Sequence, residues 1–213
     1  MNFFKDDEIK WLNGLDMAED NNQSIDVDYE TQLLSDTKTM LKIFNREVYD
    51  KMVATAEVSA YLGGAMGINE IQFYLAAHYA NIGYLGLPNI IGKKDFLTHD
   101  EKKISHLHPM YSLEYMRTRN LNIAAYLVYM HHELPNGKGY HREQKLSMDC
   151  AYLIHIADSF VGMLSHKSYR PGYSKEAAIN TVLHPYEHYD TFIGEIDVIR
   201  TALGKVSLDD LGL

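Results

Sequence analysis

Imidazole and carboxylate side chains at three places along the chain could together hold a metal ion. His131 and His132 stand side by side before Glu133, His108 lies one predicted helix earlier, and Asp158 lies in the next apolar segment. Imidazoles and carboxylates on neighbouring helices are ligands that divalent metals accept readily. Such metals generate hydroxide near neutral pH and neutralise phosphate charge, so the pattern is typical of phosphodiester cleavage.

The elements that must position these groups are helices. Apolar residues over 29–44 fall on one broad stripe, a second helix continues to Gly67, and a third spans 70–81. Strand-like alternation, internal repeats and low-complexity linkers are absent from the sequence. We therefore predict a single all-α domain, a helical bundle of about seven to nine helices.

Local signals place several helix boundaries. Thr98 and Glu101 have the capping-box spacing, so a helix should begin at residue 99 or 100. Pro109 should kink or restart it, and Pro135 ends the next helix because the residue before a proline avoids the helical region. Further helices are predicted over 122–132, after the N-cap Ser174, and over 146–164 and 193–203.

The chain divides by pattern into three parts. Residues 1–45 form an N-terminal arm and first helix, 46–204 the helical domain, and 205–213 a C-terminal tail. The arm over 1–28 is polar and irregular, and it suits either a mobile segment or a short docking helix.

Composition excludes several classes of function. The net charge of −9 repels a phosphate backbone, so we expect no nucleic-acid partner. Cys150 is the only cysteine, so no internal disulfide can form, which fits a reducing cytoplasm. The start of the chain lacks the pattern of a signal peptide, and no run approaches about 18 apolar residues, so no membrane span is expected.

The ordered motifs resemble the HD-GYP branch of the HD phosphohydrolases. The resemblance rests on His131-His132-Glu133, on the Gly-Lys-Gly-Tyr run ending at Tyr140, and on the spacing to Asp158. The segment 82–88, His108-Pro109 and Tyr169-Arg170 follow the same order, so the resemblance extends from Glu47 to Leu203. It implies a helical, metal-dependent phosphodiesterase of bacterial signalling that linearises cyclic di-GMP, often with iron or manganese.

The resemblance also implies roles for two loops. Lys167 and Arg170 align with the basic pair that meets substrate phosphates in the family, although both also suit a solvated loop. Tyr140 is either a ligand contact or a hydrogen-bonded anchor of its loop. The loop that could bind a partner consists of Asn136, Gly137, Lys138, Gly139, Tyr140 and His141.

Four positions depart from the family pattern. The His-Asp pair of the family falls on Ala80 and Asn81, its following Lys on Tyr84, and its first His ligand on Lys51. Asn81 is neutral where a carboxylate normally bridges two metals, and Ala80 offers no ligand. No catalytic residue is therefore assigned.

A reduced metal site remains compatible with the sequence. The residues that keep ligand chemistry are Glu47, His108, His131, His132 and Asp158. They would suffice for one zinc, manganese or iron ion, or the site holds no metal at all. In the second case Lys51 could form a salt bridge with Glu47 or Asp158 in place of the metal, since a buried carboxylate needs a partner. Glu47 and Lys51 also have the i,i+4 spacing of an ordinary helical ion pair.

Three functions follow from this pattern. The first, which we favour, is a non-catalytic signalling protein. It would bind a protein partner or a nucleotide through the cleft that holds the catalytic site in the family. The second is a metal-dependent phosphodiesterase acting on cyclic di-GMP or a related nucleotide with a reduced site. The third is a structural module in which the arm and first helix pair with a second copy or another chain.

Overall fold

The architecture is all-helical, as predicted. The computed structural model describes residues 25–91, 93–140 and 150–211. Within these ranges no strand occurs, and nine α-helices have seven or more residues. The elements are α2 (Val27–Phe44), α3 (Arg46–Ala65), α4 (Ile71–Tyr79), η2 (Ile82–Gly86), α5 (Pro88–Ile91), α6 (His99–Ser105), α7 (His108–Arg117), α8 (Asn122–Met130), α9 (Ala151–Leu164), α10 (Lys175–Leu183), η3 (Asp190–Phe192), α11 (Ile193–Lys205) and α12 (Leu208–Leu211).

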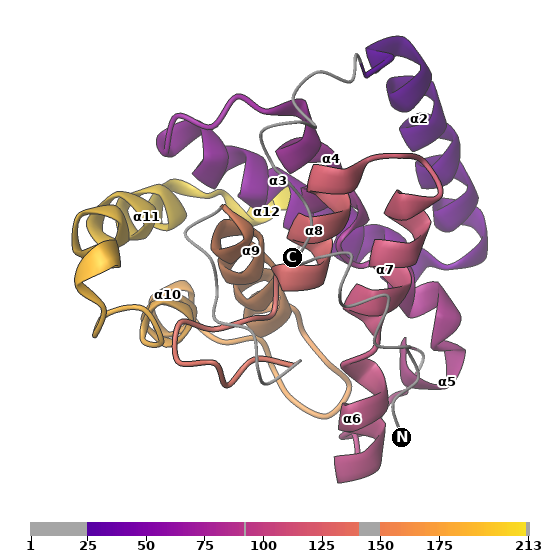
Figure 1. Cartoon of the computed structure of the whole chain (residues 1–213). Helices are drawn as coiled ribbons and strands as arrows, with labels where there is room; N and C mark the ends of the chain where they lie inside the picture. Colours follow the sequence, from indigo (N-terminus) through magenta and orange to yellow (C-terminus); the bar gives the residue numbers. More distant parts are fainter. Residues whose placement is uncertain (1–24, 92, 141–149, 212–213) are drawn as a thin grey trace.

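Helix α9 forms the centre of the bundle. Its side chains are apolar on nearly every face, and most are buried, which is the pattern of a helix surrounded by others. Helix α3 packs along α9, while α4 and α11 pack against α3. Figure 1 shows α10 and α11 on one side of α9 and the α7–α8 pair on the other. Asp158 therefore lies in the interior of the protein, on a helix that packs against α3, α8 and α10.

The first and last helices of the described residues also contact α3. Helix α2 meets α3 through a small apolar cluster of Leu41, Val48 and Met52. At the other end Val206 is buried, and α12 contacts α3. Figure 1 places α2 at the edge of the bundle.

Most helix starts agree with the sequence signals. Both hydrogen bonds of the capping box between Thr98 and Glu101 are present, and Ser174 caps α10. Pro109 occupies the first turn of α7, so it restarts a helix and does not kink one. The predicted start of α9 at residue 146 lies outside the described residues.

Two helices end earlier than predicted. Helix α4 ends at Tyr79, because the chain turns at Asn81 into the tight helix η2. Helix α8 ends at Met130, and its C-cap is His131. Both differences place site residues at helix ends, where backbone groups are available to orient them.

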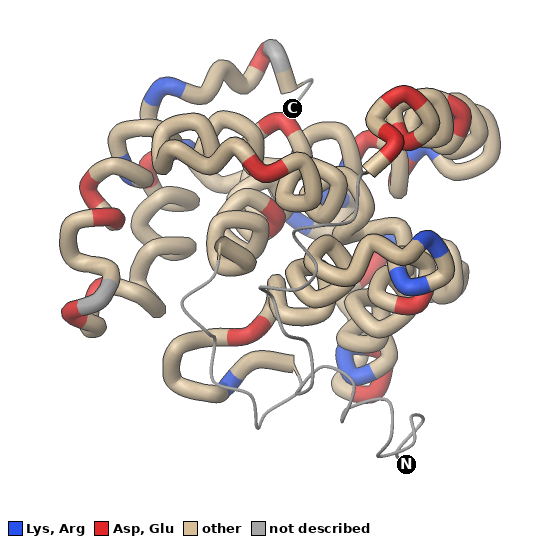
Figure 2. Tube along the Cα trace, turned by 45° about the horizontal axis from the view of Figure 1, so that its top comes forward, with Lys and Arg blue, Asp and Glu red and all other residues tan. Residues whose placement is uncertain are grey.

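The described surface carries mixed charges. Figure 2 shows acidic positions on most outer helices and no continuous basic face in that view. Among the described residues, no helix combines the length and apolar character needed to cross a membrane.

Candidate functional site

Helices α3, α7, α8 and α9 and the turn after α4 bring most of the predicted site residues together. Asn81, His108 and His131 are fully buried, and Asp158 is 4% exposed. Only Lys51, whose side chain is 22% exposed, reaches the solvent to any extent. Electrostatic interactions among these groups therefore act in a largely dry environment.

His108 begins α7 with its ring held on two sides. Its Nδ1 donates to the carbonyl oxygen of Ser105 at 2.8 Å, and Tyr84 stacks on the ring with centroids 4.2 Å apart. Gly83 allows η2 to approach the backbone here, because a Cβ at that position would lie 2.0 Å from the carbonyl oxygen of His108. The hydrogen bond places the proton on Nδ1 and leaves the lone pair on Nε2.

His131 is oriented in the same way. Its Nδ1 donates to the carbonyl oxygen of Val128 at 2.6 Å, and its Nε2 lies 3.4 Å from Nε2 of His108. Burial holds the pKa of His131 near 4 and that of His108 well below its usual value, so both rings are neutral at pH 7. Two lone pairs therefore face each other, an arrangement that a cation between them would stabilise.

His132 completes a group of three imidazoles. Its ring stacks on Tyr140 at 4.2 Å, and its Nε2 is buried with no hydrogen-bond partner among the described residues. Donor atoms of His108, His131 and His132 all lie within 4.8 Å of one another. Three neutral imidazoles of this kind fit one divalent metal, as in three-histidine zinc sites.

Asp158 has a different set of partners. Its Oδ1 accepts from Lys51 Nζ at 2.7 Å, from Asn81 Nδ2 at 2.5 Å and from Thr55 Oγ1 at 3.2 Å. Burial alone would raise the pKa of this carboxyl, but the Lys51 ammonium lowers it below its usual range. Its Oδ2 lies 3.6 Å from Nε2 of His132. The salt bridge predicted for Lys51 is present, and it is made with Asp158.

These contacts do not fit a two-metal site. The oxygen of Asp158 that faces α3 is occupied by three donors, one of them an ammonium. Asn81, which the sequence resemblance sets at the bridging position, is a neutral amide that donates to the carboxylate. The three imidazoles fit one metal ion. The carboxylate of Asp158 is paired with Lys51 instead of a second metal.

Thr55 and Ser159 contribute to the site without having been predicted, and His155, which the sequence left open as a further ligand, has a different role. Thr55 lies four residues after Lys51 on α3, so its i,i+4 spacing was the available signal. His155 donates from Nδ1 to the carbonyl oxygen of His131 at 3.0 Å, and Ser159 Oγ lies 3.4 Å from its other nitrogen. His155 is therefore a positioning residue for the turn that carries His131.

The structure does not bring Glu47 into this group. Its side chain is exposed in the first turn of α3, where its charge acts on Lys167. Lys167 itself lies close enough to the site that burial and the Lys51 charge lower its pKa. His141 lies outside the described residues.

Arg170 has a structural task in this fold. Its guanidinium donates to the carbonyl oxygens of Gly162 at 2.8 Å, Pro171 at 3.0 Å and Met163 at 3.2 Å. Two of these carbonyls belong to the last turn of α9, where carbonyls lack partners within the helix. The guanidinium thus caps α9 and is not directed to a ligand.

The loop over 136–140 covers the imidazole group. Tyr140 donates from its backbone nitrogen to the carbonyl oxygen of His132 at 3.3 Å, and its ring also stacks on His106 at 3.7 Å. Gly139 permits this contact, because a Cβ there would lie 2.5 Å from the same oxygen. Asn136 and Lys138 are exposed. Tyr140 therefore anchors its loop, and the exposed side chains of the loop face outward.

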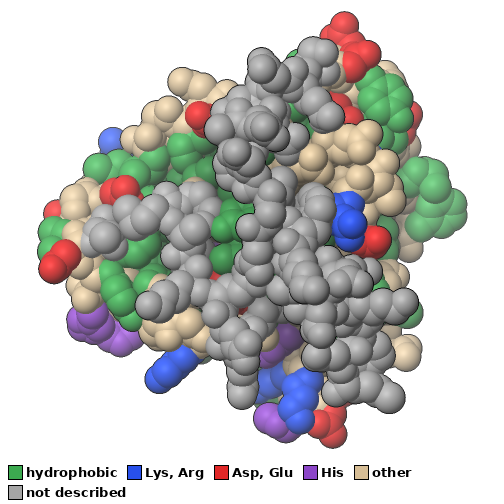
Figure 3. Space-filling view, in the orientation of Figure 1, with side chains coloured by type: hydrophobic (Ala, Val, Ile, Leu, Met, Phe, Trp, Pro, Cys, Tyr) green, Lys and Arg blue, Asp and Glu red, His purple; other side chains and the backbone are tan. Residues whose placement is uncertain are grey.

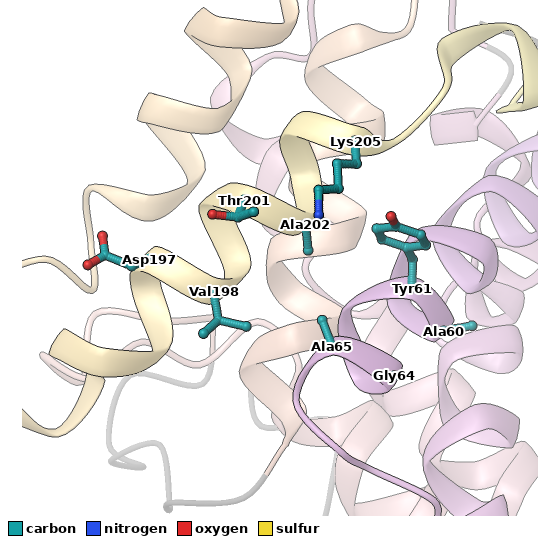
Figure 4. A pocket seen from close by; sticks show the side chains of 9 residues that line it. All are labelled: Ala60, Tyr61, Gly64, Ala65, Asp197, Val198, Thr201, Ala202 and Lys205. Carbon is teal, nitrogen blue, oxygen red and sulfur yellow. The ribbon is translucent and has the colours of Figure 1, made fainter.

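A separate cavity of about 680 Å³ lies between α3 and α11, away from these residues. Figure 4 shows small side chains of α3 facing Val198 and Thr201, with Lys205 above and Asp197 at the far end. None of the site residues lines it. We assign no role to it.

Comparison with known proteins identifies the class to which this fold and site belong. Residues 28–193 match the HD domain family, so the chain belongs to that family. This confirms the relationship predicted from the motifs.

One relative gives a more particular comparison. The cyclic di-GMP phosphodiesterase PdeB of Borreliella burgdorferi is 28% identical over 135 residues. The alignment covers 60% of this chain but 35% of PdeB, so the chain matches less than half of that protein's length.

Proposed function

We propose that this HD domain acts in cyclic di-GMP signalling by binding a protein partner or a nucleotide, without phosphodiesterase activity. The observation that carries the proposal is the salt bridge of 2.7 Å between Lys51 and Asp158. It supplies a positive charge to a carboxylate that would otherwise be available to a metal. The similarity to PdeB supports the signalling context.

Electrostatics explains why this arrangement opposes a catalytic centre. Two divalent metals carry a total of about four positive charges, and they need several anionic ligands to offset these charges. Here the carboxylate of Asp158 lies 3.6 Å from Nε2 of His132, and Lys51 already neutralises it. An ammonium in this position also repels an incoming cation.

The site also favours a second candidate, a phosphodiesterase or related phosphohydrolase with one metal. The specific observation is the convergence of His108, His131 and His132, whose donor atoms lie within 4.8 Å of one another. One metal held there would supply a Lewis acid and an activated water. The chain's own contribution would be to orient the imidazoles through the carbonyls of Ser105 and Val128.

Metal content and hydrolysis separate the two candidates. We would measure iron, manganese and zinc by elemental analysis in the full chain purified without chelator, and linearisation of cyclic di-GMP in the same samples. The wild type should hold well under one metal per chain and release no linear product. The double variant Lys51→His/Asn81→Asp removes the ammonium and adds a carboxylate. It should therefore bind more metal per chain than the wild type.

The single variant Asn81→Asp is the matched control, because it adds the carboxylate and keeps the lysine. It should gain less metal than the double variant, since Lys51 still lies beside Asp158. If the wild type holds a stoichiometric metal and hydrolyses the dinucleotide, the non-catalytic proposal is wrong and the one-metal enzyme is correct.

A further inference from the structure

Basic residues are concentrated in three segments near the imidazole group. Residues 93–106, 136–140 and 165–170 together hold seven Lys and Arg residues but three Asp and Glu residues. The whole chain has the opposite balance, with 20 basic and 29 acidic residues. Figure 3 shows Lys, Arg and His side chains along the lower edge of the molecule, where α6 lies. A local excess of positive charge on an acidic protein attracts an anionic partner to that part of the surface.

Contacts between the three segments make them neighbours in the fold. Ser168 Oγ donates to the carbonyl oxygen of Lys94. The ring of Phe96 lies against that of Tyr169, with the two centroids 4.3 Å apart. The C-cap residue of α6 stacks on Tyr140 of the covering loop. The basic side chains of these segments therefore lie on the same part of the surface, beside the imidazole group.

Four lysines of these segments form no ion pair with another described residue. They are Lys94, Lys102, Lys138 and Lys167, and we call them the basic rim. The other cations are occupied, since Lys93 pairs with Glu101 and Arg170 donates to backbone carbonyls. Lys103 pairs with Asp100 at 3.3 Å. Three lysines of the basic rim are exposed and the fourth is partly buried, so their charges are available to a partner.

Phe96 adds an apolar contact to the basic rim. Its side chain is 62% exposed, although it is a large hydrophobic group. Tyr169 supports one side of the ring, and Lys94 lies two residues away in the same loop. Aromatic side chains are enriched in the contact surfaces of proteins. The ring therefore gives this surface an apolar point of attachment among its positive charges.

We propose that the basic rim and Phe96 bind an acidic segment of a partner protein, in which Asp or Glu residues flank an aromatic or leucine side chain. This inference rests on the proposed function and deepens it by naming the chemistry of the protein partner. The carboxylates would approach the ammonium groups of the basic rim, and the apolar side chain would cover the exposed face of Phe96. Charge complementarity of this kind fixes the orientation of a partner and speeds its association.

Two other anionic partners fit the basic rim less well. A nucleic acid strand would extend beyond it, and Figure 2 shows acidic positions on most outer helices, which repel such a strand. A cyclic dinucleotide is compact, and its recognition requires polar groups that converge in a pocket. The lysines of the basic rim come from three separate segments and mostly stand in solvent. A short acidic stretch of a protein can follow them from one segment to the next.

Fluorescence anisotropy with two labelled peptides and the full chain tests the proposal. Both peptides are short and carry a central Phe, but one alternates Glu with Ala and the other has Gln in place of each Glu. At about 0.1 M salt, where the Debye length is about 10 Å, the Glu peptide should bind at least about tenfold more tightly than the Gln peptide. At about 1 M salt the Debye length is about 3 Å, so the difference should nearly vanish.

Charge reversal locates the binding surface. Lys94→Glu and Lys102→Glu should each raise the dissociation constant of the Glu peptide about 3- to 10-fold. Lys205→Glu is the matched control, because Lys205 is an exposed lysine on α11 and the variant has the same net charge. It should leave the constant nearly unchanged. Circular dichroism melts confirm that each variant is folded.

A gain of affinity gives the sharper result, since misfolding cannot produce it. Asp95 is exposed between Lys94 and Phe96, and its Oδ1 accepts from the backbone nitrogen of Phe96 at 2.7 Å. Asp95→Asn keeps this acceptor and removes the negative charge, so it should lower the dissociation constant about threefold. Asp197→Asn makes the same change at an exposed position on α11, and it should have no effect.

Equal binding of the two peptides at low salt, or equal effects of Lys94→Glu and Lys205→Glu, would overturn the inference. Displacement of the Glu peptide by cyclic di-GMP or by a single-stranded oligonucleotide at equal concentration would also overturn it, because the basic rim would then hold phosphates. Linearisation of cyclic di-GMP by the same samples reports separately on the proposed function. A chain that hydrolyses the dinucleotide and binds the peptide refutes the proposed function alone, and a chain that does neither refutes this inference alone.

Discussion

Replacing Lys51 with Met should leave the buried Asp158 carboxylate without its cation. Removing one partner of a buried ion pair costs about 3–5 kcal/mol, mainly because the remaining charge is desolvated. The lower end applies here, because the Lys51 side chain is 22% exposed and the donors Asn81 and Thr55 remain. We expect the free energy of unfolding to fall by about 3 kcal/mol, which lowers the melting temperature by about 6–12 °C for a domain of this size.

A double-mutant cycle isolates the pair. Lys51→Met, Asp158→Asn and the double variant would each be unfolded with urea in the presence of a chelator, which removes any contribution from metal. The double variant should be more stable than the sum of the single effects predicts, with a coupling of about 2 kcal/mol. Lys102→Met replaces an exposed lysine on α6, and it should change stability by less than about 0.5 kcal/mol.

The same variants report on metal. Without chelator, zinc should raise the melting temperature of Lys51→Met more than that of the wild type, because the ammonium no longer neutralises Asp158. Two results would refute the reasoning. One is a Lys51→Met protein as stable as the wild type, and the other is a coupling energy near zero. Either would mean that the salt bridge is replaced by solvent at little cost.

Two further predictions concern packing and pH. Gly83→Ala should lower the free energy of unfolding, measured with urea, by about 3 kcal/mol, because its Cβ would lie 2.0 Å from a backbone oxygen of α7. The control Gly194→Ala has no atom within 4 Å of its Cβ, so it should be neutral or slightly stabilising in the same assay. The pKa of His78 is lowered to about 4 by burial and, to a smaller extent, by Lys38. The unfolded state therefore takes up the proton first, so His78 alone should reduce the stability present above pH 6.5 by up to about 3 kcal/mol between pH 6.5 and 4, in addition to the loss from His108 and His131. His78→Gln should flatten urea-derived stability over that range, and an unchanged slope would show that His78 is not protonated on unfolding.

The imidazole side of the site was accessible to prediction from the sequence. His108, His131 and His132 come from segments whose order and spacing carry the family pattern, and Pro109 marks the start of α7 at His108. The end of α8 before His131 was not predicted, because the predicted helix continued to residue 132. Their tautomers were not accessible. These depend on the carbonyls of Ser105 and Val128, and a backbone carbonyl has no sequence signature.

The charged side of the site was harder to predict. Glu47, Lys51 and Thr55 lie on one helix face at successive turns, so spacing alone treats them alike. In the fold, Lys51 and Thr55 reach Asp158, while Glu47 lies in the first turn of α3 and remains exposed. The role of Arg170 was hard to predict for a related reason. A basic residue after a helix can contact phosphate or cap the helix, and the bend that returns it to α9 is a tertiary feature.

The cations near the imidazole group bear on which partner this site could bind. The imidazoles are neutral, Lys51 is paired with Asp158, and the guanidinium of Arg170 donates to backbone carbonyls. Among the described residues at this site, Lys167 is the cation that remains. The carboxylate of Glu47 on α3 partly offsets its charge. One partly compensated ammonium binds a phosphate diester weakly, whereas two metals would offer about four charges to it. We therefore propose a protein partner in preference to a cyclic dinucleotide, contacted through the exposed Asn136 and Lys138 of the covering loop.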